Sequence, residues 1–489
     1  MSFQKKLRKK MMSYSKKKLG ADRAYRYREN IFKAQEGIYK QTRKLKKFPE
    51  VRPDIVLQVH DTQLAITCRF IDPQKKSKRI GLRYNDNSIQ WIDENIDHFR
   101  SSETSASLSK FSIAPDTPDQ FAGLIDCTKP CKQINALAVE LVNDMHKFFP
   151  LTVQSVAGDP FPVIKRLLTL IPVSETRKRE LFDHTFGHMI GSLWSTRTRV
   201  DSHADLVAYN EHYEPTAPVV SLIIPIYGRY DFISHQLSQF ASDPTMRSHE
   251  IIYVIDDPRI ASEVRESCRY LAPVFHVAFK VLYLEKNLGY AGANNAGVAI
   301  AKADKILLLN SDVFPCKAGW LDNMVSRAGD AIQNTLLGAR LLYEDESIQH
   351  DGMSFNKAMW LDNLWINEHY GKGLPANLFS CSDGMESREC VTGACILMAK
   401  AVYDSLGGFD ENYILGDFED SDLCLKARDA GHQVAIAEDI TLYHLERQSQ
   451  SMVTPDRWKT ELTYYNCWLH TNKWNDRIVS LKEETANAG

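Results

Sequence analysis

The chain has 489 residues, which is too long for one ordinary hydrophobic core, so we expect two or three domains. Its composition, 44% hydrophobic and 25% charged with a net charge of −2, is typical of soluble globular proteins. No window approaches the ~18 consecutive apolar residues of a membrane span, and the lysine-rich N-terminus lacks the apolar stretch of a secretory signal. We therefore expect a cytoplasmic protein without a transmembrane segment.

Residues 1–47 form a strongly basic arm, which we expect to be helical or disordered. The arm contains 17 Lys or Arg against three acids, so its charge is about +14 and that of the remainder is about −16. Such a segment attracts anionic membrane surfaces or nucleic acid. We favour peripheral attachment to the inner face of the cytoplasmic membrane over nucleic acid, and a merely solvated arm remains an equal alternative.

Residues 48–215 are expected to form a small α+β accessory region. The stretches "PDIVLQVHDTQLAITCRFID" and "RIGLRYNDNSIQWID" alternate apolar and polar residues, which predicts β-strands. Apolar residues with helical spacing predict a helix over 134–149, and "VIKRLLTLI" and "HMIGSLW" are further helical patterns. A scaffold, an acceptor-binding module and a partner-docking domain all remain open as roles for this region.

From residue 216 to about 450 the chain alternates short apolar strands with helices. The strands are "VVSLIIPIY", "EIIYVIDD", "KVLYLEKN" and "KILLLNSDV", and helices are expected near 231–241, 259–271 and 291–302. This alternation predicts a parallel α/β sheet that is covered on both faces. Residues 451–489 are expected to form a C-terminal helical extension.

Polar side chains end all four of these strands, and ligands of parallel sheets bind beyond the carboxyl ends of the strands. A single aspartate at a strand end is a common turn or capping residue, but four coincident ends indicate a site. The glycine-rich stretch "NLGYAGANNAG" (287–297) precedes the fourth strand. Small residues at a helix start allow an anion such as a diphosphate to reach free N–H groups, although the spacing matches neither a Walker A loop nor a dinucleotide fingerprint.

The stretch from about 219 to 450 resembles an inverting glycosyltransferase of family 2 and the GT-A type. The motifs that carry this resemblance occur in the family's order: "VSLIIPIYGR", "EIIYVIDD", "NLGYAGANNAG", "LLLNSDV", "TGACILM", "LGGFDENYI" and "FEDSDLCLKARDAG". The resemblance implies a Rossmann-like, mostly parallel GT-A catalytic domain that uses a nucleotide-sugar.

The resemblance also implies a divalent cation, Mn²⁺ or Mg²⁺, between the protein and the donor diphosphate. Asp312 is similar to the last acid of the family's Asp-x-Asp motif, whereas Asn310 stands at the first position and lacks the charge. His444 in "LYHLERQS" occupies the place of a second metal ligand. Carboxylate, imidazole and phosphate oxygen suit such a cation.

Transfer with inversion needs a base on the acceptor hydroxyl. Matched to the family's Glu-Asp motif, Asp420 is the expected base and Glu419 helps to orient the acceptor. Acids at a helix N-terminus are also favoured by the helix dipole, so capping is the alternative interpretation of this cluster.

The same matching places further residues around the substrates. The residues expected at the donor are Pro225, Tyr227, Asp257, Gly289, Asn294, Ser311 and Asp312. Those expected at the donor sugar or the acceptor are Thr392, Gly393 and Ala394.

The sequence therefore predicts a glycosyltransferase that acts on a UDP- or dTDP-sugar and on a glycan or lipid-linked acceptor of a bacterial surface polysaccharide. A sugar nucleotidyltransferase would share the α/β design but would not need Asp420. A catalytically silent nucleotide-sugar-binding subunit of a polysaccharide assembly complex is the second alternative, for which Asn310 leaves room.

Overall fold

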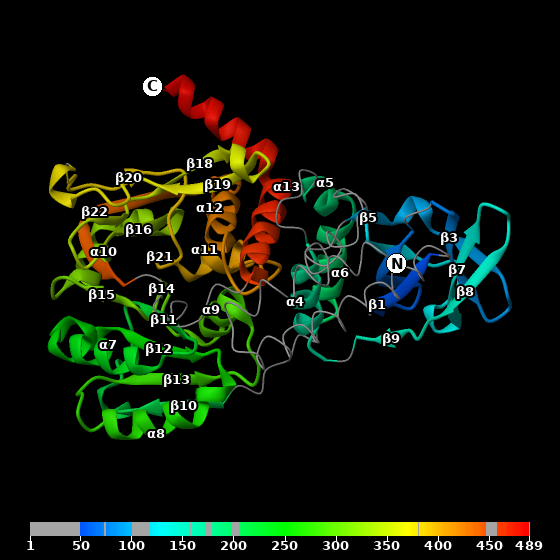
Figure 1. Cartoon of the computed structure of the whole chain (residues 1–489). Helices are drawn as coiled ribbons and strands as arrows, with labels where there is room; N and C mark the ends of the chain where they lie inside the picture. Colours follow the sequence, from blue (N-terminus) through cyan, green and yellow to red (C-terminus); the bar gives the residue numbers. More distant parts are fainter. Residues whose placement is uncertain are drawn as a thin grey trace, which may run out of the picture. The chain divides into compact units, whose positions relative to one another are not determined.

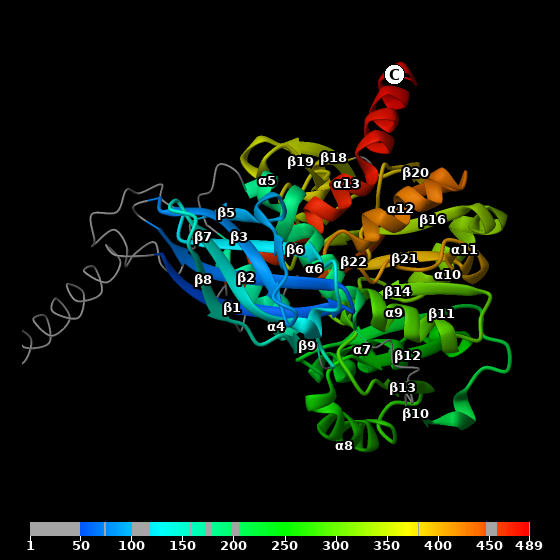
Figure 2. The same ribbon diagram turned by 90° about the vertical axis from the view of Figure 1, so that its right-hand side faces the viewer.

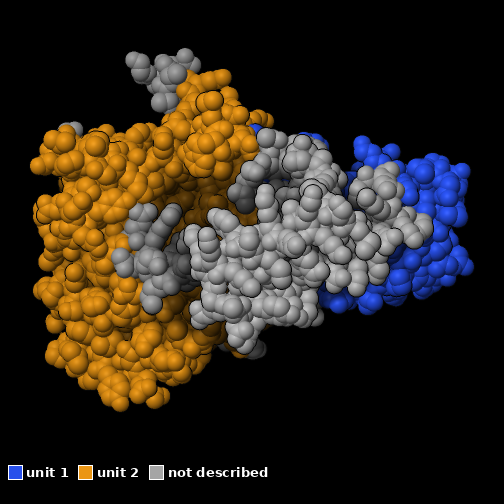
Figure 3. Space-filling view, viewed as in Figure 1, with its two compact units in different colours: residues 1–196 blue, residues 197–489 orange. Residues whose placement is uncertain are grey.

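The computed structural model of the protein describes residues 49–72, 75–99, 118–156, 158–171, 178–197, 205–379, 381–445 and 457–488. The expected basic arm, residues 1–47, lies outside these residues. The chain forms two compact units, residues 1–196 and 197–489, which are coloured separately in Figure 3. In the described part of the chain, no helix combines the length and the apolar character that a membrane crossing requires.

The first unit contains two antiparallel sheets with a shared hydrophobic core. The sheet orders are β5-β6-β2-β1-β9, in which only β9 is parallel to its neighbour, and β4-β3-β7-β8. Buried side chains such as Leu64 and Phe121 of the first sheet and Leu82 of the second belong to one cluster. The elements are β1 (Glu50–His60), β2 (Gln63–Ile71), β3 (Ser77–Tyr84), β4 (Ile89–Trp91), β5 (Asp97–Phe99), β6 (Gln120–Asp126), β7 (Ile134–Leu141), β8 (His146–Pro150), β9 (Gln154–Ser155), α4 (Phe161–Leu170), α5 (Lys178–Leu181) and α6 (Gly187–Ser195).

The helix expected over 134–149 is wrong. These residues form the hairpin β7–β8, in which β7 also pairs with β3. The turn contains Asp144 with a φ of +59°, a conformation that aspartate tolerates in turns. Because pairing on both sides of β7 satisfies its backbone, tertiary structure overrides the helical spacing of its apolar residues. The strands expected before residue 93 and the helical patterns in α4 and α6 are confirmed.

The second unit is built on one mixed sheet with the order β10-β13-β12-β11-β14-β21-β16-β22-β15 (Figure 1). The strands β11, β12, β13 and β14 are parallel, as expected, whereas β21 runs antiparallel to both of its neighbours. Strands β17 and β20 pair with β16 and β22 at the side of this path, and β18 and β19 form a separate two-stranded sheet. The strands of the unit are β10 (Asp205–Tyr209), β11 (Ser221–Ile226), β12 (Glu250–Ile255), β13 (Phe279–Tyr283), β14 (Lys305–Leu309), β15 (Val313–Pro315), β16 (Thr335–Leu342), β17 (Ile348–His350), β18 (Met353–Ala358), β19 (Leu364–His369), β20 (Glu386–Ser387), β21 (Cys395–Ala399) and β22 (Gln433–His444).

Helices cover both faces of this sheet, as the alternating pattern predicts (Figures 1 and 2). Helices α7, α8 and α10 pack into the hydrophobic cluster on one face, and α9, α11, α12 and α13 pack into the cluster on the other. Burial on both faces explains why β12 is buried along its whole length. The helices are α7 (Asp231–Ser242), α8 (Ala261–Leu271), α9 (Gly289–Ile300), α10 (Trp320–Ala328), α11 (Lys400–Ser405), α12 (Glu419–Asp429) and α13 (Arg457–Ala488).

Candidate active site

The carboxyl ends of β11, β12 and β14 lie side by side, because β11 pairs in parallel with both of the other strands. Beyond these ends the chain places Tyr227 after β11, Asp256 and Asp257 after β12, and residues 310–312 after β14. The sheet therefore brings the expected strand-end residues to one edge, where ligands of parallel sheets bind. Pro225 lies within β11, opposite Val254 of β12.

Asp257 is bound by an arginine that the sequence analysis did not single out. The Nε and Nη2 atoms of Arg259 each donate to the Asp257 carboxylate at 2.7 Å, and the Gly228 backbone N–H donates at 3.2 Å. Burial opposes the charge of Asp257, but the hydrogen bonds from Arg259 outweigh burial and lower the pKa of this carboxyl. Arg259 Nη2 also donates to the Tyr227 hydroxyl at 3.2 Å, so one guanidinium joins two residues expected at the donor.

The glycine-rich stretch 287–297 contains the start of α9, which lies beside the same edge of the sheet. The Asp256 carboxyl accepts a hydrogen bond of 2.6 Å from the Leu288 N–H, and burial raises the pKa of Asp256 well above its usual value. Gly289 follows with a φ of +74°, and a Cβ at this position would lie 3.1 Å from the Leu415 Cα. Both the backbone conformation and the close approach therefore require glycine.

Asn294 is fully buried one turn into α9. Its amide donates to the Tyr290 carbonyl at 2.9 Å, and its side-chain oxygen makes no hydrogen bond with the described residues. A buried polar atom without a protein partner is unusual, and this oxygen is therefore available to a bound water or ligand.

Asp312 and His444 lie next to each other at the junction of β15 and β22. The residue pair Val313 and His444 is in register between these strands, and His444 Nε2 lies 3.4 Å from an Asp312 carboxylate oxygen. His444 Nδ1 lies 3.2 Å from Gln349 Oε1. When Nδ1 carries the proton and donates to Gln349, the Nε2 lone pair faces Asp312, and the two side chains fit two ligand positions of a divalent cation.

The described residues contain no preformed group of three or more His, Cys, Asp or Glu side chains that could hold a metal ion. A cation at Asp312 and His444 would therefore take further ligands from phosphate oxygens and water, which is the pattern that Mg²⁺ shows with nucleotides. Asn310 adds no anionic ligand here, and its side-chain oxygen makes no hydrogen bond with the described residues. Ser311, which lies between Asn310 and Asp312 in the sequence, is half-buried.

Asp420 lies in the first turn of α12, against the chain segment that contains Thr392, Gly393 and Ala394. Its carboxylate accepts hydrogen bonds from the Gly393 N–H at 2.9 Å and from the Ser421 N–H at 2.7 Å. Burial nevertheless raises the pKa of Asp420 above its usual value. A carboxylate that is held in place and has a raised pKa is a stronger base than an ordinary aspartate.

Glu419 is buried beside Asp420, and its Oε2 atom makes no hydrogen bond with the described residues. Burial and the neighbouring charge of Asp420 raise the pKa of Glu419 well above its usual value. The two carboxyls therefore share a site in which burial disfavours a double negative charge.

The turn that leads into α12 has a left-handed backbone at four consecutive positions. The φ angles are +64° at Leu415, +146° at Gly416, +75° at Asp417 and +74° at Phe418. Each such conformation at a residue other than glycine costs on the order of 1 to 3 kcal/mol and persists only where surrounding contacts hold it. One such contact is the hydrogen bond of 3.1 Å that the Tyr290 N–H donates to the Leu415 carbonyl.

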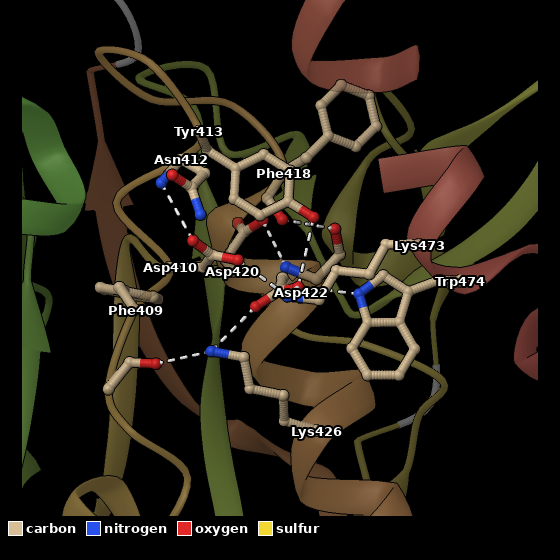
Figure 4. A network of polar contacts seen from close by, with 12 residues as sticks. Phe409, Asp410, Asn412, Tyr413, Phe418, Asp420, Asp422, Lys426, Lys473 and Trp474 are labelled. Carbon is tan, nitrogen blue, oxygen red and sulfur yellow. Dashed lines mark hydrogen bonds and ion pairs between the residues drawn. The ribbon is translucent and has the colours of Figure 1, made fainter. Parts of the chain in front are cut away.

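Asp422 is fully buried at the centre of a polar network, shown in Figure 4. Its carboxylate accepts from Trp474 Nε1 at 2.8 Å and from the Tyr413 hydroxyl at 3.2 Å. Lys473 and Lys426 approach it with Nζ at 2.6 and 3.0 Å. Capping and solvation are the alternative interpretation of the acids at this helix start, but the contacts of Asp422 with Trp474 and Lys473 attach the first turn of α12 to α13.

His350 is a second residue that the sequence analysis missed. Its Nε2 atom accepts hydrogen bonds from the Gly352 N–H at 3.2 Å and from the Thr392 N–H at 3.3 Å, and its Nδ1 lies 3.1 Å from His369 Nδ1. Burial lowers the pKa of His350 well below its usual value, so the ring is neutral. Its Nε2 atom can therefore accept the hydrogen bond that holds the Thr392 backbone. No sequence pattern indicated this contact, because 42 residues separate the two partners.

Residues 221–373 match the model of the family described as Glycosyl transferase family 2. The uncharacterised protein y4gI of Sinorhizobium fredii is 28% identical over 53% of this chain and 28% of its own length. The O-antigen biosynthesis protein RfbC of Myxococcus xanthus is 25% identical over 52% of this chain and 19% of its own length. The chain thus spans less than a third of these two relatives.

A third relative is covered over more of its length. The amylovoran biosynthesis glycosyltransferase AmsB of Erwinia amylovora is 27% identical over 46% of this chain and 69% of its own length. The matched residues include β12 and β14, the strands that precede Asp257 and Asp312. Residues 221–373 therefore form part of a domain that matches glycosyl transferase family 2, on the mixed α/β sheet described above.

Proposed function

We propose that this chain is an inverting glycosyltransferase that moves a sugar from a UDP- or dTDP-sugar to a glycan or lipid-linked acceptor in the synthesis of a bacterial surface polysaccharide. The family match supports the reaction class, and the names of the Myxococcus and Erwinia relatives support the polysaccharide context. The donor, the acceptor and the inversion are part of the proposal.

One connection carries this proposal. The Ala394 carbonyl accepts a hydrogen bond of 3.0 Å from the Asn310 N–H at the end of β14, and the Gly393 N–H next to it donates to Asp420 at 2.9 Å. Two adjacent residues thus join the strand end that carries Asp312 to the carboxylate of Asp420. The proposed metal-binding acid, Asp312, and the proposed base, Asp420, would thereby lie on either side of one segment, Thr392 to Ala394.

The donor would occupy the edge formed by β11, β12 and α9. Asp257 would accept a hydrogen bond from the uracil or thymine ring, next to the loop from Pro225 to Tyr227. The start of α9 at Gly289 would face the diphosphate, since helix N-termini favour anions. Asn294 and Ser311 would complete this side of the donor site.

Asp312 and His444 would hold the divalent cation, Mn²⁺ or Mg²⁺, which when bound offsets the charge that develops on the leaving diphosphate. Gln349 orients His444 for this role, because it occupies the other ring nitrogen. Asn310 contributes no charge, so the protein supplies one carboxylate at this position.

Asp420 would act as the base in the transfer step. It accepts the proton of the acceptor hydroxyl while the oxygen of that hydroxyl forms a bond to the anomeric carbon. The bond between that carbon and the diphosphate oxygen breaks, and the nucleoside diphosphate leaves with the electron pair. Attack on the face opposite the leaving group inverts the anomeric configuration. Glu419 would bind and orient the acceptor beside Asp420.

The test is a transfer assay on the full chain with a panel of nucleotide-sugars, each with and without Mn²⁺, and with glycan and lipid-linked acceptors. We expect one donor to yield a product whose anomeric configuration, read by NMR, is opposite to that of the donor. Retention of configuration would overturn the inverting mechanism. Donor binding without transfer would favour a silent binding subunit, and pyrophosphate release from a nucleoside triphosphate would favour a nucleotidyltransferase.

A further inference from the structure

We infer that α13 is a positioning element for Asp420 and that Asn466 is its central positioning residue. This inference rests on the proposed function of Asp420 as the base. Five α13 residues at helical spacing contact the segment from Ile414 to Asp422, which contains the left-handed turn and the start of α12. These residues are Thr463, Asn466, His470, Lys473 and Trp474.

Asn466 supports the turn itself. It is fully buried, and its Oδ1 accepts a hydrogen bond of 3.1 Å from the Ile414 N–H while its Nδ2 donates to the Ile414 carbonyl at 3.1 Å and to the Gly416 carbonyl. A left-handed run has no regular backbone partners for these groups. An amide suits the place because it donates and accepts at once, whereas a carboxylate cannot donate and an apolar side chain can do neither.

Two further contacts support the second half of the turn, Asp417 and Phe418. The Thr463 hydroxyl donates to the Asp417 carboxylate at 2.8 Å, and His470 Nε2 lies 3.1 Å from the Ser421 hydroxyl, which donates to the Phe418 carbonyl at 3.0 Å. His470 also packs against the Phe418 ring, with centroids 5.3 Å apart. Every residue of the turn except Leu415 thus has a partner that α13 supplies directly or through Ser421.

Asp422 completes this attachment. Its bonds to Trp474 and Lys473 fix the first turn of α12 two residues beyond Asp420 (Figure 4). The backbone is therefore tied to α13 both before and after Asp420, and the direction of the Asp420 carboxylate follows from these two attachments. No α13 residue named here contacts Asp420 itself, so the helix acts through the turn.

The experiment compares Asn466→Asp, which keeps the size and the acceptor but loses the donors, with Asn472→Asp, an exposed position on the same helix. We expect Asn466→Asp to lower kcat by about 10- to 100-fold with little change in the KM for the nucleotide-sugar, because a small displacement of a reacting group costs about this much. Hydrogen exchange should rise in the peptide 414–422 and stay unchanged in α9. Asn472→Asp should match the wild type in all three readouts.

An Asn466→Asp variant with wild-type kcat and wild-type exchange in 414–422 would overturn the inference, and so would an equal rise of exchange throughout the unit. If Asn466→Asp does not fold, Thr463→Val decides the question, since it removes only the bond to Asp417 at an exposed position. Thr463→Val should lower kcat several-fold and raise exchange in 414–422, and no change in either would contradict us. A wild-type chain that transfers no sugar would refute the proposed function instead, while the exchange comparison would still show whether α13 holds the turn.

Discussion

The Asp420 carboxylate accepts a hydrogen bond from the backbone N–H of Gly393, at 2.9 Å. The carbonyl of the same Gly393 accepts from the Tyr290 hydroxyl at 2.7 Å. A Cβ at Gly393 would lie 3.3 Å from the Tyr290 ring and 3.4 Å from the Asp420 Cβ. One glycine thus connects the acid of α12 to the helix that begins at the glycine-rich stretch, and a side chain there would push the two apart.

The first prediction concerns the base. Asp420→Asn keeps the shape, and its amide oxygen can accept one of the two backbone hydrogen bonds, from Gly393 or from Ser421. The change removes the proton acceptor, so transfer should fall by at least about 10²-fold. Donor binding, measured by calorimetry, should remain at the wild-type level. Asp429→Asn, at the exposed far end of α12, is the control; it removes only an ion pair with Arg477, far along α13 from the turn, and should transfer normally. An active Asp420→Asn variant would assign the base to another group.

The second prediction concerns pH. Burial raises the pKa of Asp420, whereas hydrogen bonds from the Gly393 and Ser421 N–H groups and, more weakly, from the Thr392 hydroxyl lower it. Because the base must be deprotonated, kcat should rise with pH through a value above the usual ~3.9 of aspartate. Thr392→Val removes the last of these hydrogen bonds, so the acid limb of the kcat profile should move to higher pH. The control Thr460→Val lies on the exposed side of α13 and should leave the limb in place.

The third prediction concerns the metal. Asp312→Ala should abolish the additional thermal stabilisation that Mn²⁺ gives to the donor complex, since selective binding stabilises the folded state by mass action. Gln349→Leu should weaken the apparent Mn²⁺ affinity by about 10- to 100-fold, because His444 loses the partner that orients it. Gln333→Leu, an exposed change, should have no effect. Unchanged Mn²⁺ titrations in both variants would remove these residues from a metal site.

The fourth prediction concerns stability. Arg340 donates two hydrogen bonds of 3.0 Å to the buried Asp351 and lies 3.6 Å from Glu438. Arg340→Met leaves Arg388 as the remaining cation beside Glu438 and Asp351, at 2.6 and 3.8 Å. The free energy of unfolding should therefore fall, by at most about 3 to 5 kcal/mol. Arg327→Met breaks a half-exposed pair with Asp439 and should cost less than about 1 kcal/mol. Denaturant unfolding of the two variants measures the difference, and equal losses would refute it.

The fifth prediction concerns the basic arm, which lies outside the described residues. Deleting residues 1–30 should release the protein from anionic vesicles at low salt, because each basic residue near such a surface contributes about 1 kcal/mol. Activity on soluble acceptors should be unchanged. Vesicle binding that survives the deletion would place any membrane contact elsewhere in the chain.

The positions of Asp257 and Asp312 were predictable because strand ends of a parallel sheet meet at one edge, and the strand pattern was clear in the sequence. The pairing of His444 with Asp312 came from the resemblance alone, since 132 residues separate them along the chain. Arg259 carried a weak local signal, because it lies two residues after Asp257 in an Asp-Pro-Arg turn.

Other features were not predictable from local pattern. Asn466 and His350 look like ordinary polar residues in the sequence, and only the fold brings their side chains to backbone groups of the turn and of Thr392. The hairpin β7–β8 was taken for a helix because apolar spacing does not show which strands lie on either side. Contacts over long sequence separation decide such cases, and a single sequence does not encode them locally.

The attachment of the turn to α13 has a consequence for module exchange. The family match ends at residue 373, but Asp420 and its supports lie beyond it, as far as Trp474. A chimera that imports residues 221–445 into a relative would bring a left-handed turn without the helix that stabilises it. Grafts that retain residues 205–488 as one piece should keep both the turn and the helix that supports it.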